Sequence, residues 1–421
     1  MIKHILKIIW TQRKNNTWIF LELVVVICAL WWMTDQLYVD LRTYYSPLGY
    51  DITNTWRFKL SKLNPGSPDF IKEEDYVSNQ TEDLLTLMSH IRQHPSVEEV
   101  CATYYSCPYS YGNSWRGLTP IDGDTTIASE RSFQIRNVSI EYFDVFRIKD
   151  KNGNLITPQI EGIHNPIIIS EDMEELFYHG EQAKGRKVKY SEAEEAITIA
   201  AVSAPIRVDD YSRSDPCFFN CATGSGFVDL VTGFGAESAE LCVRMKQYAT
   251  LDDMNKLLAE MGERLTVNNL YVYGVRATEE FRNESLGERD SDRNKQLSLM
   301  LFLLVNVFFG IVGTFWLRTQ YRQAELGLRI AVGASRVSLK KYLFIEGLCL
   351  LILTLPLVAL FIANMAYMDK LDSYRIAFSF VRFFITIGGT YLLMSGMICL
   401  GIWFPVQKVN KIAPAEALHY E

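Results

Sequence analysis

Four long apolar runs stand out in the pattern of hydrophobic and polar residues. The runs lack the regularly spaced charges of a soluble helix, and each reaches the roughly 20 residues that cross a hydrocarbon core about 30 Å thick. They cover residues 18–38, 297–317, 342–368 and 383–404. The pattern predicts a membrane protein with four transmembrane α-helices, one before and three after a long intervening segment.

The intervening segment, residues 40–290, alternates strand patterns with helix patterns. The stretch after Thr81 has apolar residues at helical spacing and stops at Pro95, whereas residues 131–148 alternate in part as a half-buried strand does. NPIIISEDMEELF predicts an isoleucine-rich strand, a helix cap at Ser170 and an amphipathic helix. These units predict a large α+β domain, whose charged C-terminal end could extend the second span as a helical stalk.

One part of the chain has an excess of acidic residues, and the rest has an excess of basic residues. Residues 40–290 contain 25 Lys and Arg against 40 Asp and Glu, a balance of −15, so the rest of the chain carries +8 within the total of −7. The basic residues cluster near both termini and in the connector between the second and third runs, residues 318–341. Short cytoplasmic loops hold the excess of Lys and Arg. We therefore expect both termini and the connector in the cytoplasm, and residues 40–290 outside.

Both ends of the chain carry basic residues. Residues 1–17 combine apolar positions with four positive charges, as an amphipathic helix on the inner membrane surface does. The same charges could form the n-region of a signal peptide. Because the first run continues into Trp31, Trp32 and Asp35 without a small-residue cleavage site, we interpret it as a retained anchor. Residues 405–421 are expected to form a cytoplasmic tail.

Eight cysteines are present, and five of them lie in the segment predicted to be external, where disulfides are chemically permitted. Cys101 with Cys107 and Cys217 with Cys221 are near enough in sequence to bridge, but spacing alone does not define connectivity. The fifth, Cys242, leaves an odd number that cannot all pair. Buried thiols without a functional role are the alternative.

Two carboxylates fall within apolar runs. Glu22 lies near one end of the first run, and Glu346 lies one turn into the third. An intramembrane carboxylate is a functional-site hypothesis by default. At this depth, we favour the alternative that each carboxylate reaches the interface or pairs with another helix.

The sequence contains no recognisable enzyme motif. It has no G-x-x-x-x-G-K-[ST] phosphate loop and no G-x-S-x-G nucleophile elbow, and GSGF at residues 224–227 indicates only a turn. His90 and His94 have the i, i+4 spacing of metal ligands but lack the glutamate of a zinc-protease helix. Acidic pairs such as Asp209 and Asp210 are most simply solvated surface. We therefore expect a non-catalytic chain without a cofactor of its own.

The connector carries more information than its position requires. It holds six positive charges and one negative charge, Glu325. Positive charge alone could serve only to keep the loop in the cytoplasm. However, ELGLRIAVGAS places Leu326 and Ile330 at helical spacing, then breaks at Gly333-Ala334-Ser335 before a second helical start. A short helix held at the membrane surface is suited to docking a cytoplasmic protein.

ELGLRIAVGASR resembles the E-[IL]-G-[IL]-R-x-A-[LV]-G-A-[ST] signature of the FtsX-like, or MacB-type, ABC transporter permeases. VSIEYFDVFRI, NPIIISEDMEELF and the Gly185-Arg186 stretch are similar to the external core domain of that family, and PAEALHYE is similar to its C-terminal end. The resemblance implies a fold with one span before and three after an α+β extracytoplasmic domain of the MacB periplasmic-core type. It places the chain in the bacterial inner membrane.

The family resemblance also implies a task for the connector, which contacts a cytoplasmic ATPase in that family. The residues implied in or beside this contact are Arg322, Glu325, Gly327, Arg329, Gly333, Ala334 and Arg336. ATP and Mg²⁺ would then be bound by the partner ATPase. Other implied partners are a second, identical or different, permease chain, membrane lipid and an export component of the periplasm or outer membrane, but no nucleic acid.

Mechanotransmission is the function that the resemblance implies: closure of the ATPase moves the connector, spans and stalk and so reshapes the external domain. The output could be export or expulsion of a substrate, or control of a cell-wall enzyme. A membrane-anchored receptor or scaffold that acts without ATP is the alternative from another class. An anchored ectoenzyme is a third hypothesis.

Overall fold

The computed structural model describes residues 11, 13–72, 75, 78–110, 114–124, 131–190, 195–321, 332 and 335–409. Its contacts divide the chain into two compact units, each of which is described by itself. The sheet unit is Tyr45–Glu288, and the helical unit combines Met1–Tyr44 with Arg289–Glu421.

The sheet unit is built on a mixed sheet of eleven strands among the described residues. They are β1 (Thr55–Lys62), β2 (Val97–Tyr104), β3 (Ser114–Pro120), β4 (Ser132–Val138), β5 (Ile167–Ser170), β6 (Lys187–Tyr190), β7 (Ile197–Ser203), β8 (Cys217–Cys221), β9 (Glu240–Met245), β10 (Thr266–Val267) and β11 (Leu270–Ala277). Their order is β10-β11-β1-β9-β2-β4-β3-β6-β7-β5-β8. A parallel pairing of β4 with β8 closes the last six strands into a ring.

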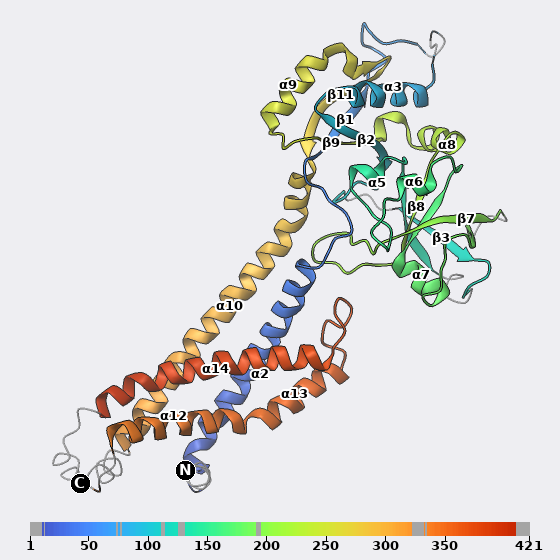
Figure 1. Ribbon diagram of the computed structural model, residues 1–421. Helices are drawn as coiled ribbons and strands as arrows, with labels where there is room; N and C mark the ends of the chain where they lie inside the picture. Colours follow the sequence, from blue (N-terminus) through green and yellow to red (C-terminus); the bar gives the residue numbers. More distant parts are fainter. Residues whose placement is uncertain are drawn as a thin grey trace. The chain divides into compact units, whose positions relative to one another are not determined.

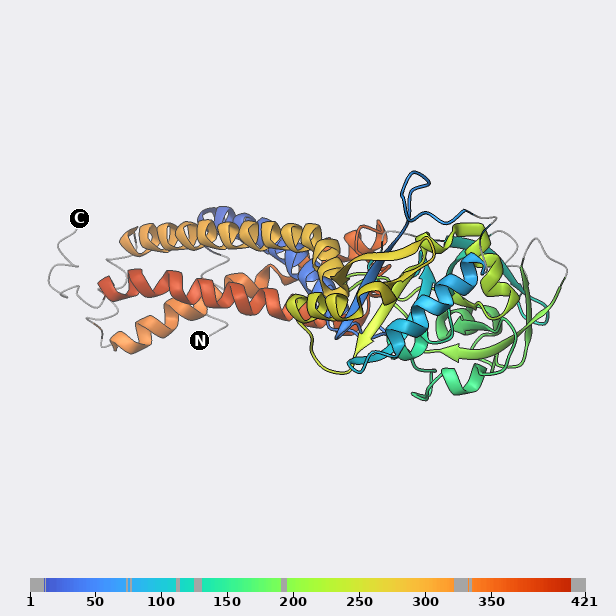
Figure 2. The same ribbon diagram turned by 90° about the horizontal axis from the view of Figure 1, so that it is seen from above.

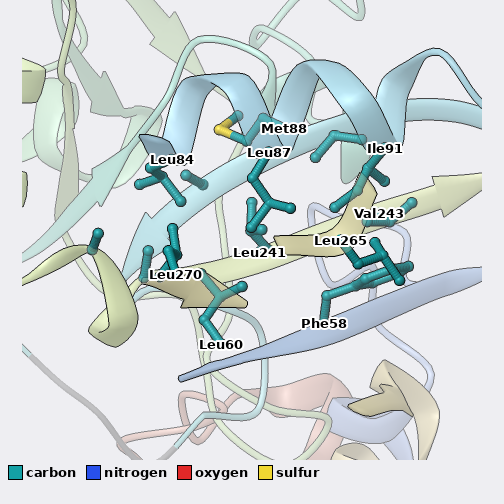
Figure 3. Close-up of a cluster of buried hydrophobic side chains, with 14 of the residues drawn as sticks. Phe58, Leu60, Leu84, Leu87, Met88, Ile91, Leu241, Val243, Leu265 and Leu270 are labelled. Atoms are coloured by element: carbon teal, nitrogen blue, oxygen red, sulfur yellow. The ribbon is translucent and has the colours of Figure 1, made fainter. Parts of the chain in front are cut away.

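Helix α3 (Gln80–Arg92) packs on the open part of this sheet, together with α8 (Ser225–Phe234), α9 (Leu251–Met261) and the short turns η2 (Ala236–Ser238) and η3 (Gly262–Leu265). Figure 3 shows how Leu84, Leu87 and Ile91 of α3 face Phe58 of β1 and Val243 of β9. All five side chains are fully buried. The spacing i, i+3, i+7 places the three α3 residues on one face of the helix, as the sequence predicted.

Helix caps confirm one sequence prediction and shift another. The Ser170 hydroxyl accepts the backbone N–H of Met173 at the start of α7 (Glu171–Tyr178), as predicted. The helix predicted after Thr81 is α3, which begins slightly earlier, at Gln80, because Asn79 is its cap. The Asn79 side chain accepts the N–H of Glu82, and the Glu82 carboxylate accepts the N–H of Asn79. This reciprocal pair satisfies two N–H groups that a helix start leaves free.

The strand predicted within residues 131–148 is confirmed over part of that stretch, whereas the turn predicted at GSGF is wrong. Within the alternating stretch 131–148, only β4 is a strand, and the second half contains the short helix α5 (Tyr142–Val145). A second short helix, α6 (Thr157–Ile160), follows this stretch. Buried side chains at 142, 143, 145 and 146 follow helical rather than strand spacing. The GSGF stretch, expected to be only a turn, opens the ten-residue helix α8.

The helical unit contains α2 (Arg13–Tyr44), most of α10 (Thr278–Tyr321), α12 (Arg336–Leu353), α13 (Leu355–Tyr367) and α14 (Phe380–Val409). Among the described residues, three stretches are long and apolar enough to cross a membrane: Phe20–Tyr44, Val337–Tyr367 and Phe380–Trp403. They correspond to the first, third and fourth predicted spans. The second predicted span, residues 297–317, is helical and lies within α10. Some of its side chains are not among those that the structure describes, so the count of four spans stays a prediction.

The third predicted span is two helices rather than one. Helix α12 ends at Leu353 and α13 begins at Leu355, with Pro356 in the first turn of α13. Proline lacks the N–H that would continue the helical hydrogen bonds, so the ladder breaks there. Thr354 lies at the break, where its hydroxyl donates to the carbonyl of Leu351 at 2.6 Å and lies 2.9 Å from the Tyr391 hydroxyl.

Helix α10 confirms the predicted stalk. It is one helix of 44 residues and continues through Gly287. At 1.5 Å per residue it is about 66 Å long. At the chain ends, residues 13–17 belong to α2 and residues 405–409 to α14, whereas the rest of the predicted N-terminal helix and of the tail lies almost wholly outside the described residues.

Within the helical unit, α14 is the central packing element. It contacts α12 and α2 most extensively, and α2 also contacts α12 and α13. Both views show α12 and α14 running alongside each other (Figures 1 and 2). The shared core includes Ile27 and Trp31 of α2 and Met394 and Ile398 of α14, all of which are fully buried.

Truncation of Leu87 to alanine is expected to lower the free energy of unfolding by about 2–5 kcal/mol, because it leaves a cavity between α3 and the sheet. Thermal unfolding of the detergent-purified chain measures the loss. Leu85→Ala is the matched control: its side chain lies on the same helix but is 48% exposed, and its effect should stay within about 0.5 kcal/mol. Equal losses in the two variants would contradict the core described above.

Candidate functional site

Most of the predicted ATPase-coupling site lies outside the described residues. The site residues that lie outside are Arg322, Glu325, Gly327, Arg329, Gly333 and Ala334. The structure describes the two ends of the connector. Helix α10 ends at Tyr321, and α12 begins after Ser335, whose side chain accepts the N–H of Ser338 at 3.2 Å. Arg336 is therefore the first residue of α12, which confirms the predicted second helical start.

At its N-terminal end, α10 directly follows the last strand of the sheet. Strand β11 ends at Ala277 and α10 starts at Thr278, so no linker separates them. Arg276, the penultimate strand residue, pairs with Glu280 at 2.9 Å and also with Glu284 of the helix. These pairs are exposed enough to contribute little stability individually. Their position nevertheless ties the strand to the first two turns of α10.

A second attachment joins α10 to residues 207–215, hereafter the Asp210 loop. Arg282 of α10 donates to both oxygens of the Asp210 carboxylate, at 2.6 and 3.1 Å. The Tyr109 hydroxyl donates to the same carboxylate at 2.7 Å. The Asp210 side chain is 3% exposed, so the interpretation of Asp210 as solvated surface is wrong. A buried carboxylate needs such partners, because water no longer solvates it.

The contacts of Asp210 determine its charge. Burial opposes ionisation, but hydrogen bonds from Arg282 and Tyr109 and the charges of Arg282 and Arg207 lower its pKa below the ordinary 3.8. Burial raises the pKa of Tyr109, and its donation to Asp210 acts in the same direction. Asp210 is therefore an anion at neutral pH, and the Tyr109 hydroxyl keeps its proton.

Arg207 connects the same loop to the point where the chain enters the sheet unit. Its guanidinium donates to the carbonyl oxygens of Ser212 at 2.7 Å, Ser46 at 2.6 Å and Asp210. Ser46 is the second residue of the sheet unit. The Asp210 loop thus holds the entering segment through Arg207 and the departing helix through Asp210. Both crossings between the units are attached to one short loop.

The helical unit contains a buried ion pair between α2 and α14. Arg382 Nε and Nη2 donate to the two carboxylate oxygens of Asp35 at 2.9 and 2.6 Å. The two side chains are 0% and 1% exposed. Arg382 Nη1 also donates to the carbonyls of Asp372 and Ile376. This two-pronged geometry is the strong form of a charge-assisted hydrogen bond.

Further polar contacts surround this pair. Arg375 bridges Asp40 of α2 and Asp372, and Trp31 Nε1 donates to the Thr386 hydroxyl at 3.0 Å. The first and last apolar helices are therefore joined by specific bonds as well as by apolar packing. Sequence reasoning missed this cluster. The sequence did contain a signal. Asp35 lies near the end of the first apolar run and Arg382 lies directly before the last, and a charge at such a position predicts a partner of opposite charge.

The two intramembrane carboxylates have neighbours within the helical unit. A Cβ added to Gly310 of α10 would lie 2.7 Å from Glu22 Oε1, so the carboxylate occupies the space that a side chain would need. Glu346 of α12 is 1% exposed. We favoured the alternative that each carboxylate reaches the interface or pairs with another helix, and the closeness of Glu22 to α10 agrees with the second of these outcomes.

The other candidate ligands have separate partners. His90 Nδ1 lies 2.9 Å from the carbonyl of Arg264, and His94 Nε2 lies 3.4 Å from Glu260. In the structure, none of the eight cysteines is joined to another by a disulfide bond. Cys217 and Cys221 occupy the two ends of β8, about 13 Å apart in an extended strand, which exceeds the span of a disulfide. That proposed bridge is wrong.

No protein-family profile matches the chain, and no curated protein matches it. Solved structures do. The chain is similar to the periplasmic region of MacB from Actinobacillus actinomycetemcomitans, with 16% identity over 58% of this chain and 97% of that one, at a TM-score of 0.34. It is also similar to the extracellular domain of the noncanonic ABC-type transporter YknZ from Gram-positive bacteria, with 14% identity over 52% and 100%, at 0.29.

Replacement of Asp35 by alanine leaves the Arg382 guanidinium buried without its counter-ion. The expected loss is about 3–5 kcal/mol in the stability of the helical unit. The double variant Asp35→Leu/Arg382→Met should lose less than either single variant, because no charge is left unpaired. The midpoint of heat-induced aggregation of the detergent-purified chain ranks the variants. Additive losses would show that the two side chains do not interact.

Asp210→Asn should loosen the start of α10 in a pH-dependent way. The folded pKa of Asp210 is lowered, so its ionised form stabilises the fold above pH 3.8, and this contribution disappears as the pH falls through the lowered pKa. Because Arg282 is 25% exposed, the pair is assigned only about 1.5 kcal/mol, or roughly tenfold faster amide exchange over residues 278–285 at neutral pH.

Hydrogen exchange read by mass spectrometry measures this change. The difference between Asp210→Asn and the wild type should shrink at acidic pH, once both carry an uncharged side chain. Asp229→Asn is the control, because Asp229 is exposed. A difference that persists unchanged below the lowered pKa would rule out the charge as its cause.

Proposed function

We propose that the chain is the permease subunit of an ABC transporter complex of the FtsX-like, MacB-type family. It transmits the ATP-driven motion of a separate cytoplasmic ATPase to the sheet unit outside the membrane, and so exports or expels a substrate found there. The observation that carries the proposal is α10, one unbroken helix between the last strand of the sheet unit and the connector that bears the family signature.

An unbroken helix is a suitable transmitting element. Its backbone hydrogen bonds run along its axis, so a displacement at one end moves the other end instead of being absorbed by a loop. Arg276 and Arg282 tie its first turns to β11 and to the Asp210 loop. Motion of α10 therefore acts on the sheet unit at a defined place, to which Arg207 also fastens the entering chain.

The polar contacts of the helical unit support the same role. The Asp35–Arg382 pair and the Trp31–Thr386 hydrogen bond join α2 to α14. An unpaired charge in hydrocarbon is costly, so separation of these two helices is strongly disfavoured. Helices α2 and α14 then move as one body.

The nucleotide chemistry is assigned to a partner. The sequence has no phosphate-loop motif, whereas the connector has the positive charge and helical spacing of a docking surface. The partner ATPase binds ATP and Mg²⁺ in the cytoplasm. A second permease chain, identical or different, completes the membrane part of the complex in the bacterial inner membrane.

Charge reversal in the connector tests the proposed docking. Arg329→Glu is expected to reduce co-purification of a Walker-motif ATPase with the tagged chain by about tenfold, since the loss of one charged contact across an interface costs of order 1.4 kcal/mol or more. Mass spectrometry of the complex, solubilised from native membranes, measures the ratio of ATPase to permease.

Lys256→Glu is the matched control, because Lys256 is an exposed cation on α9 of the sheet unit and its side chain is 73% exposed. It should leave the ratio unchanged. If Arg329→Glu, and Glu325→Lys separately, left every cytoplasmic association intact, an ATP-independent receptor would replace the proposed permease.

A further inference from the structure

Three of the cysteines gather at one place in the sheet unit. Cys101 of β2 and Cys242 of β9 are directly opposite each other in the antiparallel ladder. Cys107, in the connection between β2 and β3, places its sulfur 3.4 Å from that of Cys242. All three side chains are buried. Sequence spacing did not suggest this cluster, because Cys242 is 135 residues away from Cys107.

The contact between Cys107 and Cys242 is fixed by the surrounding backbone. Glu240, two residues before Cys242, accepts the N–H groups of Ser106 at 3.0 Å and Cys107 at 2.9 Å. Its other oxygen pairs with Arg57 at 3.1 Å. Glu240 is itself buried, so these bonds hold the segment of Cys107 firmly against β9. The two sulfurs are thus neighbours because of interactions that do not involve sulfur.

A metal site does not explain the cluster. Within the described part of the chain, no group of three or more His, Cys, Asp or Glu side chains is arranged to hold a metal ion. The thiols are also protonated. Hydrogen bonding with Cys242 and burial raise the pKa of Cys107 well above its ordinary value, and hydrogen bonding with Cys101 and burial do the same for Cys242.

We propose that Cys107 and Cys242 form a disulfide in the mature protein, with Cys101 remaining a thiol. This inference rests on the proposed function in one respect, namely that the sheet unit lies outside the membrane, where disulfides persist. Formation proceeds by thiol–disulfide exchange with a disulfide oxidant of that compartment. The two cysteines lose two hydrogens and two electrons and gain one S–S bond, while the oxidant disulfide is reduced to two thiols.

The bond has a defined place in the order of folding. Thiolate is the attacking species, and burial suppresses it in the folded unit. Oxidation therefore precedes closure of the core around Glu240. Once made, the bond links β9 to the β2–β3 connection and resists their separation. Under the proposed mechanical role, it lets the sheet unit take load from α10 without shearing the ladder between β2 and β9.

Peptide mapping of the full-length chain tests the bond. Cells expressing the protein are quenched with acid, free thiols are blocked with N-ethylmaleimide, and the purified chain is digested without reduction. The expected result is a linked peptide pair containing Cys107 and Cys242, with Cys101 alkylated. The linked pair should disappear in Cys107→Ser. A linked Cys101–Cys242 pair, or complete alkylation of Cys107 and Cys242 in a chain whose sheet unit is external, would overturn the assignment.

Location is tested separately, so the two proposals can fail independently. Lys256→Cys introduces a thiol at an exposed position of α9, and a membrane-impermeant maleimide added to intact spheroplasts should label it. Absence of labelling would contradict the proposed orientation. In that case the purified chain is unfolded and reduced, and is then refolded in a buffer of reduced and oxidised glutathione, so that the thiols can react before the core closes. A Cys107–Cys242 link would then support the pairing, and its absence would refute it.

Discussion

A charge removed from water needs a partner, and the chain meets this requirement at the points where distant segments join. Asp35 and Arg382 meet inside the helical unit, and Asp210 and Arg282 meet at the root of α10. Glu240 gathers Arg57 and the backbone of the β2–β3 connection. In each case the loss of one partner costs more than the pair contributes net, because the remaining charge stays buried. Such pairs specify which segments lie together.

The apolar spans and the local helix starts were easier to predict from the sequence than the buried ion pairs. Apolar length located the spans, and local hydrogen bonding located the start of α7 at Ser170, because both depend on residues that are close in sequence. The stalk followed from the charged pattern before the second run. The connector was recognised by its signature, but the residues proposed to contact an ATPase are ones on which the structure is silent.

The buried charges could not be predicted from the sequence. Asp210 is next to Asp209, and an acidic pair in a loop has the same local pattern whether it faces water or Arg282, which is 72 residues further on. For the same reason, the sequence did not show that Cys107 and Cys242 are neighbours. The pairing of β2 with β9 brings their two segments together. Helix α5 was missed for a related reason: aromatic and β-branched residues favour strands locally, but burial of four side chains at helical spacing decided the conformation.

The ring of six strands has a consequence for the protein before its partners are bound. Closure of β4 onto β8 removes one free edge of the sheet. At the opposite end, the outermost strand is β10, which is only two residues long. Exposed edges are templates for pairing with strands of other molecules, and short or charged edges resist it. A large β-rich unit can therefore be crowded at a membrane surface without polymerising edge to edge.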